Sequence, residues 1–352
     1  MKPTHQVDYA IIGQGLAGSL IAHFLLERGK TVHVFDNGHR TSSSVVAAGI
    51  INPITGWRFV KSWRIDELLP FAKQTYRHLE QQLDASFLTE TDIIRSIHSQ
   101  KDRNNWLLRS TLPDYAPYMQ DEVDWNEFIQ KIRLPYSAGT VRKSCRLNCE
   151  KFLNEYKLFL TNNGSYTLTE ISPEDMNRLS GGLPINGLVT KAVIDCRGYR
   201  AKQEGSFGQL PFGGSKGEVL LVKIPGANFT RLFKNRIFIV PMEDDLYWVG
   251  SAYENDFEDD RPTEQGKQTL REKLEAALRM PYEIVDHRAA IRPTVKDRRP
   301  FLGTHPQISN LHIFNGLGTK GASLGPFFAN RLAAYLCEGV PLEDVVNIAR
   351  FD

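Results

Sequence analysis

The 352-residue chain has little cysteine, no long apolar run and almost no excess of charge of either sign. Only Cys145 and Cys149 of its four cysteines lie close together, and none of the nine histidines completes a recognised metal-binding spacing. We therefore expect buried free thiols and no metal site. No apolar stretch approaches the ~20 residues of a membrane-spanning helix, and the first apolar strand begins too close to Met1 to leave room for a signal peptide. These absences predict a cytoplasmic protein without a membrane span.

The charge balance excludes a further class of protein. Lysine and arginine total 43, and aspartate and glutamate total 41, which gives a net charge of +2. A dedicated nucleic-acid-binding protein is far more basic. A hydrophobic content of 41% is that of a globular protein, and a chain of this length usually folds as more than one domain.

What the chain does have is a glycine-rich turn near its start. An apolar stretch at residues 9–12 is followed by Gly13, Gly15 and Gly18, which have the spacing G-x-G-x-x-G, and helix-forming residues follow at 16–28. The first glycine permits the tight turn, the second lets a pyrophosphate approach the backbone, and the third lets helix and strand pack closely.

The continuation of this segment indicates what the turn binds. A second apolar strand at residues 31–35 ends at Asp36, close to the ~20-residue spacing of a carboxylate that holds a ribose hydroxyl. The free N–H groups around Leu16 and Ala17, at the start of the helix, attract phosphate. We therefore predict a dinucleotide site at this turn, with Asp36 and Asn37 at its ribose end. The alternative is a strand–helix–strand unit with a tight turn and no ligand.

The rest of the chain alternates between helical and strand patterns. Helices are expected at residues 66–83, at 149–160 with Asn148 as the N-cap, at 263–278 and at 323–337. A parallel strand is expected at 187–195, just before Gly198, and strands of an antiparallel sheet at 218–224, 236–241 and 246–252. Residues 41–60 are rich in small and hydroxyl side chains without a period, and residues 86–140 give no clear assignment.

A second glycine-rich turn, residues 315–321, leads into the last helix. It offers another set of free backbone N–H groups. The alternative interpretation is a tight turn without a function.

Together these features resemble the flavin-dependent D-amino acid oxidase family, and within it glycine oxidase, sarcosine oxidase and the flavin domain of the bifunctional tRNA-modifying methylaminomethyl-uridine enzymes. The resemblance is sharp at residues 9–36, 40–54, 191–199 and 289–326. It implies an FAD cofactor held by the first turn, by the 43–51 segment and by the second turn. The implied contacts beyond Gly13 to Gly18, Asp36 and Asn37 are Ser43, Ser44, Ala48, Gly49, Ile51, Gly198, Arg292, Gly316, Gly318, Thr319, Lys320 and Gly321.

The resemblance also implies a reaction, the oxidation of a C–N bond by hydride transfer to flavin N5. The resulting imine is hydrolysed by water. Arg292 resembles the arginine with which the family binds a substrate carboxylate, a role that suits a planar, permanently charged group; the alternative is a structural ion pair with Asp297 or Glu218. Lys320 is expected to stabilise negative charge on the reduced flavin, unless it is exposed to solvent.

Two departures from the family pattern argue against glycine and simple D-amino acids as substrates. The second glycine-rich turn carries Thr319 and Lys320 where glycine oxidases have an arginine, and residues 237–241 include no tyrosine. Tyr247 and Tyr253 are near that strand, but the sequence does not place either in a pocket. A small amine or amino acid is the expected partner, and the oligomeric state is open.

The sequence also allows three alternative functions. A modified tRNA base is an alternative substrate, although the near-neutral charge and the lack of a methyltransferase domain count against it. A flavoprotein scaffold without turnover is a second alternative. A dehydrogenase that uses NAD alone leaves the second turn unexplained.

The expected fold is α/β: a Rossmann-like FAD-binding domain with a second, smaller α+β substrate domain built on an antiparallel sheet. The FAD-binding domain is expected at residues 1–75, 140–205 and 285–352, and the substrate domain at 76–139 and 206–284.

Overall fold

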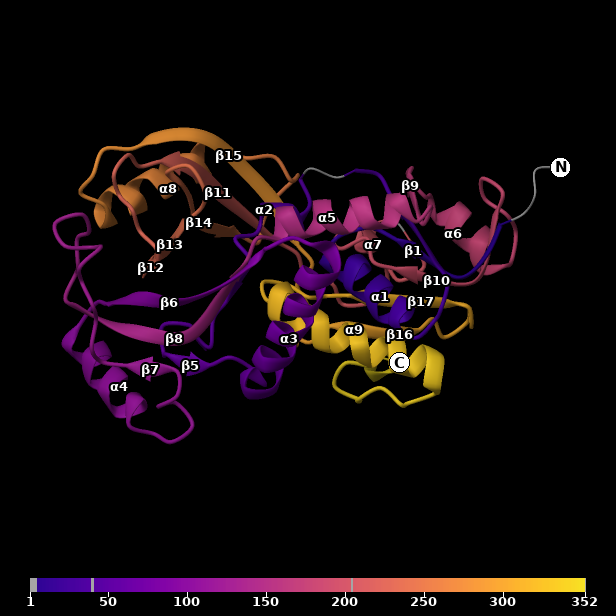
Figure 1. The fold of residues 1–352 in the computed structure, drawn as a ribbon, viewed down its shortest axis with the longest axis horizontal. Coiled ribbons are helices and arrows are strands. Elements are labelled where there is room, and N and C mark those ends of the chain that lie inside the picture. Colours follow the sequence, from indigo (N-terminus) through magenta and orange to yellow (C-terminus); the bar gives the residue numbers. More distant parts are fainter. Residues whose placement is uncertain (1–4, 39–40, 204, 352) are drawn as a thin grey trace.

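The computed structural model describes residues 5–38, 41–203 and 205–351. Residue 40, where one stretch of the family resemblance begins, lies outside the described residues, as do residues 1–4, 204 and 352 of the predicted domain ranges. Within the described ranges the chain forms two large sheets that lie side by side along the longest axis (Figure 1).

The first sheet contains the strands on either side of the N-terminal glycine turn. Its order is β16-β17-β10-β1-β2-β9, and all neighbours are parallel except β16 and β17. The strands are β1 (His5–Ile12), β2 (Val32–Asp36), β9 (Tyr166–Leu168), β10 (Leu188–Asp195), β16 (Phe301–Thr304) and β17 (Leu311–Asn315). Because the chain leaves β1 toward β2 on one side while β10 pairs on the other, a crevice for a ligand is expected at the carboxyl end of β1.

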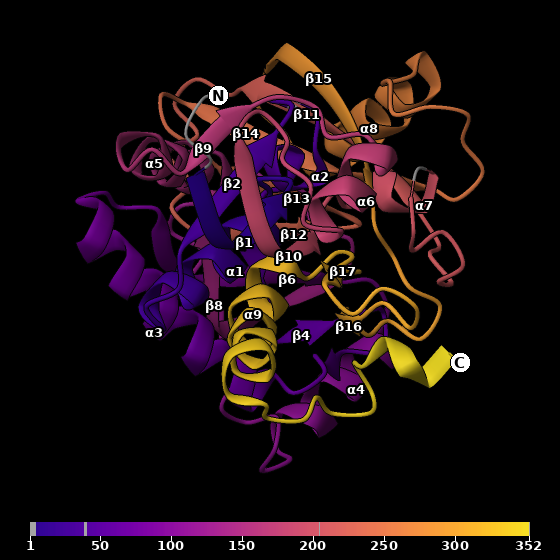
Figure 2. The ribbon, with the colours of Figure 1, turned by 90° about the vertical axis from the view of Figure 1, so that its right-hand side faces the viewer.

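Helices cover both faces of this sheet (Figure 2). One face packs against α1 (Leu16–Glu27), α5 (Cys149–Asn162) and α9 (Gly321–Glu338). Helix α3 (Ile65–Leu83) packs outside them, on α9 and α5. The other face packs against α6 (Pro173–Ser180) and α7 (Arg200–Gln203). The predicted cap is confirmed, since Asn148 Oδ1 accepts a hydrogen bond of 3.2 Å from the backbone N–H of Lys151.

The second sheet has the order β15-β11-β14-β13-β12-β6-β8-β3, with β7 paired to β8. Its strands are β3 (Ile50–Ile51), β6 (Leu88–Ile97), β7 (Met119–Gln120), β8 (Ser137–Leu147), β11 (Ser215–Lys223), β12 (Leu232–Asn235), β13 (Ile237–Pro241), β14 (Leu246–Glu254) and β15 (Glu283–Arg292). The expected antiparallel sheet is therefore present, with one parallel pair, β6 and β12. Helix α8 (Glu264–Ala277) packs on one of its faces.

Two segments that the sequence left unassigned contain regular structure. Residues 41–60 form α2 (Ser43–Val46), β3, β4 (Ile54–Thr55) and the start of β5 (Val60–Lys61). Residues 86–140 supply β6, α4 (Gln100–Ser110), β7 and the first part of β8. Both β8 and β15 pair within the second sheet, although the predicted division places most of each in the FAD-binding domain; the division itself stays a prediction.

The cysteines are free thiols. Cys145, Cys149 and Cys196 are buried, and Cys337 is half-buried. Burial raises the pKa of Cys145 to about 11, so this thiol is unreactive at neutral pH.

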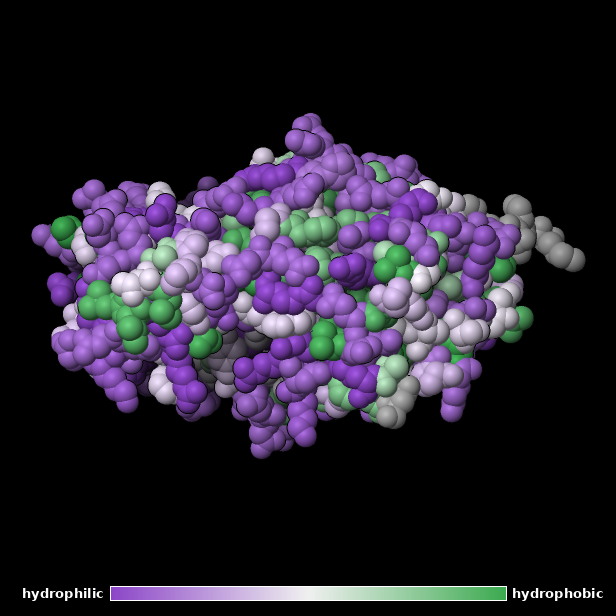
Figure 3. All heavy atoms as spheres, turned by 90° about the horizontal axis from the view of Figure 1, so that it is seen from below, coloured by the Kyte–Doolittle hydropathy of each residue, from purple (hydrophilic) through white to green (hydrophobic). Residues whose placement is uncertain are grey.

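The outer surface contrasts with the interior. Seen from below, one face is mostly hydrophilic, and its apolar side chains gather in small separate groups (Figure 3). No helix in the described part of the chain has both the length and the apolar character needed to cross a membrane.

Candidate functional site

Two cavities meet at the N-terminus of α1. The first has a volume of about 740 Å³ and the second about 1010 Å³. The two cavities share five of their lining residues, Gly15, Ser43, Ser44, Cys196 and Gly198. The cavities therefore lie next to each other, and the predicted phosphate-binding turn stands at their junction.

The turn has the geometry that its glycines were expected to serve. A Cβ atom on Gly18 would overlap the carbonyl oxygen of Gly13, so no larger residue lets α1 approach β1 this closely. The first turn of α1 has no side-chain cap on Gly15 and no acidic residue. Leu16 and Ala17 line the first cavity, and the start of the helix presents a partial positive charge to it.

Asp36 stands at the wall of the second cavity. Its two carboxylate oxygens accept hydrogen bonds from the backbone N–H groups of Gln14, at 2.8 Å, and of Gly38, at 2.7 Å. Gly13 and Asn37 line the same cavity. The carboxylate thus fixes the glycine turn, and each oxygen keeps a second lone pair for a ligand hydroxyl.

The small-residue segment runs along both cavities. Ser44 Oγ accepts a hydrogen bond of 3.2 Å from Leu16 N–H, which ties α2 to the start of α1. Ala48 and Gly49 line the first cavity. Ile51 does not line either cavity, because its side chain is buried in the core instead.

The second glycine-rich turn borders the first cavity at the start of α9. Gly318, Thr319, Lys320 and Gly321 line it, whereas Gly316 packs against Val295 and Phe301. Lys320 is half-buried rather than exposed, and its Nζ donates a hydrogen bond of 3.3 Å to Ser62 Oγ. Burial lowers the pKa of Lys320, and the charges of Arg298 and Arg299 add to this effect.

Arg292, at the end of β15, projects into the first cavity. Its Nη2 donates a hydrogen bond of 2.9 Å to Ser251 Oγ, and its guanidinium carbon lies 4.7 Å from the ring centre of Tyr253. In the described part of the chain Nη1 is buried without a hydrogen-bond partner. Burial lowers the pKa of Arg292, and a buried cation of this kind is stabilised by an anionic ligand.

Among the residues that the structure describes, none forms the structural ion pair that was the alternative for Arg292. Glu218 bonds instead to His287 Nε2 at 2.8 Å, and Asp297 to Arg350 Nε at 2.9 Å. Tyr253 lines the cavity, whereas the hydroxyl of Tyr247 is buried elsewhere and accepts a hydrogen bond from Phe229 N–H.

The sequence missed the far end of the first cavity. The lining there includes Gly56, Trp57, Phe59, Arg95, Ser96, His98, Asp102, Lys234, Arg236 and Phe238. Most of these residues come from segments without clear periodicity or from β12, which was not expected. Together with Arg292 and Lys320 they give the cavity five arginine and lysine side chains, one histidine and a single carboxylate, Asp102, among the described residues.

Comparisons with known proteins agree on the family. The family model described as FAD dependent oxidoreductase matches residues 8–335. The chain is 24% identical to a glycine oxidase of Pseudomonas aeruginosa, over 95% of this chain and 96% of that protein. It is 23% identical to the tRNA 5-methylaminomethyl-2-thiouridine biosynthesis bifunctional protein MnmC of Idiomarina loihiensis, over 98% of this chain and 59% of that protein. Among solved structures, glycine oxidase from Geobacillus kaustophilus matches with a TM-score of 0.80 at 20% identity, over 99% of this chain and 98% of that one.

Proposed function

The chain belongs to the family of FAD-dependent oxidoreductases, and we propose that it oxidises the C–N bond of a small amine that carries a carboxylate. The observation that supports this proposal best is the buried, unpaired Nη1 of Arg292 in the wall of the first cavity. An arginine with one free edge binds a carboxylate with directional, charge-assisted hydrogen bonds.

The residues around the two cavities fit FAD. The uncapped start of α1, with Gly15 and Ser44 beside it, suits the pyrophosphate, and Asp36 suits a ribose hydroxyl. Ala48, Gly49 and the 318–321 turn offer small side chains and backbone groups for the ring system at the first cavity. The remaining predicted residues, Gly18, Ile51 and Gly316, would support the site by packing rather than by contact.

When bound, FAD supplies the two-electron acceptor that amine oxidation needs. The protein's own part is to bind and orient the amine and to stabilise charge. Arg292 would fix the carboxylate, and therefore the direction of the neighbouring C–N bond. Lys320 would hold positive charge at the second glycine-rich turn, where Ser62 Oγ accepts a hydrogen bond from its ammonium.

The proposal is tested by an anaerobic titration of the FAD-loaded protein. Amines with and without a carboxylate, including N-methyl amino acids and both enantiomers of amino acids, are added while the visible absorption band of the oxidised flavin is followed. We expect at least one carboxylated amine to bleach the band. In Arg292→Met the concentration needed should rise roughly 30-fold or more, since truncating a buried charge-paired group costs about 2–5 kcal/mol. If no carboxylated amine bleaches the band, or if Arg292→Met responds like the unmodified protein, the proposal is wrong.

A modified tRNA base is the second candidate substrate, and the similarity to a relative named for tRNA modification supports it. The net charge of +2 favours a small molecule instead. The cytoplasmic location remains a prediction that cell fractionation would test.

A further inference from the structure

Arg95 and Lys234 are directly opposite each other on the parallel strands β6 and β12. Side chains at directly opposite positions share one face of a sheet, and like charges placed there repel each other. Both residues line the first cavity. The fold therefore holds two cations together at the far end of the cavity, away from the N-terminus of α1.

Neither cation forms an ion pair with an acidic side chain in the described residues, although the charge of Asp102 partly offsets the effect of burial on the pKa of Arg95. Arg95 Nη2 donates to the carbonyl of Gly56 at 2.9 Å, while its Nε is buried without a partner. Lys234 Nζ donates to the carbonyl of Arg236 at 3.0 Å. Asp102, the single carboxylate in the lining, accepts a hydrogen bond of 2.8 Å from Ser99 Oγ.

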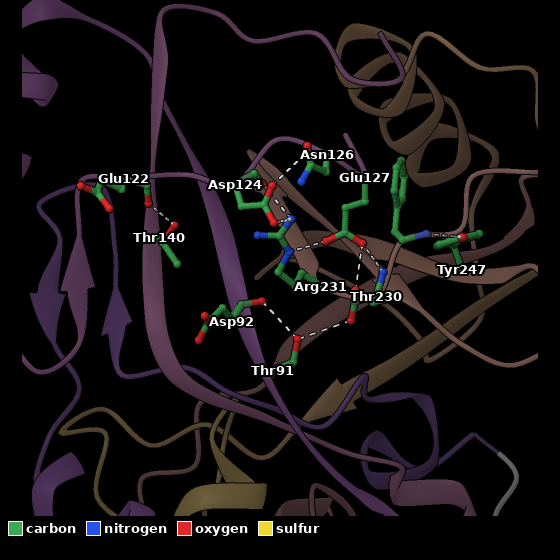
Figure 4. Close-up of polar contacts among 11 residues, drawn as sticks. Thr91, Asp92, Glu122, Asp124, Asn126, Glu127, Thr140, Thr230, Arg231 and Tyr247 are labelled. Carbon is green, nitrogen blue, oxygen red and sulfur yellow. Dashed lines mark hydrogen bonds and ion pairs between the residues drawn. The ribbon is translucent and has the colours of Figure 1, made fainter. Parts of the chain in front are cut away.

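Next to the other end of β12, a basic side chain does have acidic partners. Arg231, just before β12, forms ion pairs with Glu127 and Asp124, and Glu127 also accepts a 3.0 Å hydrogen bond from Thr230 Oγ1 (Figure 4). These contacts tie β12 to the segment beside it and satisfy its outer cation. Lys234, which lines the cavity, has no acidic partner within residues 5–38, 41–203 and 205–351, and this points to an anionic ligand.

The second sheet places this pair of cations within reach of Arg292. Lys234 is opposite Phe238, and Phe238 is opposite Gly250, the neighbour of the Ser251 that holds Arg292. Strands in a sheet are about 4.8 Å apart, so the backbones of Lys234 and Gly250 are separated by roughly 10 Å. The ammonium of Lys234 lies 4.2 Å from the ring centre of Phe238 and therefore extends over the strand between them.

We propose that Arg95 and Lys234 form a second anion subsite, so that the substrate is a short amine with two acidic groups. One group, a carboxylate, would be bound by Arg292, and the other, a carboxylate or a phosphate-like group, by Arg95 and Lys234. The role of Arg292 in this proposal rests on the proposed function. The second subsite is inferred independently, from the positions of Arg95 and Lys234.

The electrostatics of the pair agree with such a role. Burial lowers the pKa of Lys234 to about 7, and the charges of Arg95 and Lys273 contribute. A bound dianion would replace part of the lost hydration and favour the charged ammonium.

The test is a binding measurement on the FAD-loaded protein. The ligands are acids without an amino group, so that they bind without being oxidised. Isothermal titration calorimetry at pH 6.5 compares glutarate, with two carboxylates, with butyrate, which has one. A third titration uses 3-phosphonopropionate, in which a phosphonate replaces the second carboxylate. We expect glutarate or 3-phosphonopropionate to bind at least roughly tenfold more tightly than butyrate, because each charge-assisted hydrogen bond contributes about that much or more. The tighter of the two identifies the second acidic group.

In the variant Lys234→Met the dianion and butyrate should bind with nearly equal dissociation constants. Arg95→Gln provides a second test if the first variant does not fold. Lys223→Met is the matched control, because Lys223 is exposed on the same sheet and lies outside both cavities. Lys223→Met should prefer the dianion over butyrate as strongly as the unmodified protein does. Equal affinities for the mono- and dianions, or no binding of either dianion, would overturn the subsite. Bleaching by a monocarboxylated amine together with such a result would leave the proposed function standing and remove the subsite alone.

Discussion

Gly217 and Arg292 lie on the neighbouring strands β11 and β15, and the guanidinium of Arg292 occupies the space into which a side chain at position 217 would project. The absence of a side chain on one strand thus determines where the cation of the next strand lies. Ser251 on β14 then fixes the guanidinium through a hydrogen bond of 2.9 Å.

Gly217→Ala should therefore impair carboxylate binding while leaving the cofactor in place. The new methyl group would push the guanidinium away from Ser251, and we expect the dissociation constant for a carboxylate ligand to rise roughly tenfold or more. Calorimetry with a monocarboxylate measures this, and the visible flavin spectrum checks that FAD is retained. Unchanged affinity would show that Arg292 does not hold the carboxylate in this position.

Lys320→Met should slow flavin reduction without preventing substrate binding. The methionine keeps most of the volume of the side chain but removes the positive charge at the start of α9, where Lys320 contacts Ser62. We expect the limiting rate of anaerobic bleaching in a stopped-flow experiment to fall at least roughly tenfold. The midpoint potential of the bound flavin should become more negative in the same variant. If both the rate and the potential are unchanged, Lys320 has no electrostatic role.

Gly18→Ala should destabilise the N-terminal unit. Its Cβ would overlap the carbonyl oxygen of Gly13, a backbone atom that cannot rotate away, and overpacking of this kind typically costs about 1–3 kcal/mol. We expect a lower free energy of unfolding in urea and weaker retention of FAD. Gly208→Ala is the control, because the nearest atom to a Cβ there is at an ordinary distance of 3.4 Å; equal losses in both variants would contradict the packing argument.

Binding of a dianion should weaken as the pH rises through about 7. The pKa of Lys234 is lowered to about 7 by burial, so the ammonium is charged below this pH and neutral above it; a bound anion shifts the transition upward. Among the other groups at this end of the cavity, Arg95 stays charged, since its lowered pKa is about 10, and burial lowers the pKa of His98 below its ordinary 6.5. Arg236 adds positive charge and Asp102 negative charge.

Calorimetry with glutarate between pH 6 and 9 checks this expectation. The affinity should fall over that range in the unmodified protein and vary much less in Lys234→Met. A pH dependence that survives in the variant would assign the titration to another group, and His98→Gln would then be the next variant to measure.

The local parts of this protein could be predicted from its residues. The glycine turn, the helix that follows it and Asp36 were predicted because backbone geometry and hydrogen bonding act over a few residues there. The Asn148 cap was predictable for the same reason. The family resemblance added FAD, which the family match supports.

The far end of the first cavity depends instead on contacts between strands that are distant in the chain. Arg95 and Lys234 lie next to each other because β6 pairs in parallel with β12. The local pattern of residues 86–140 does not predict this long-range pairing. The position of Arg292 depends likewise on Gly217 and Ser251, which reach it from two other strands of the second sheet. Local preferences fix turns, caps and helices, whereas the direction and charge environment of a buried side chain depend on strands that are distant in sequence and become neighbours only in the folded sheet.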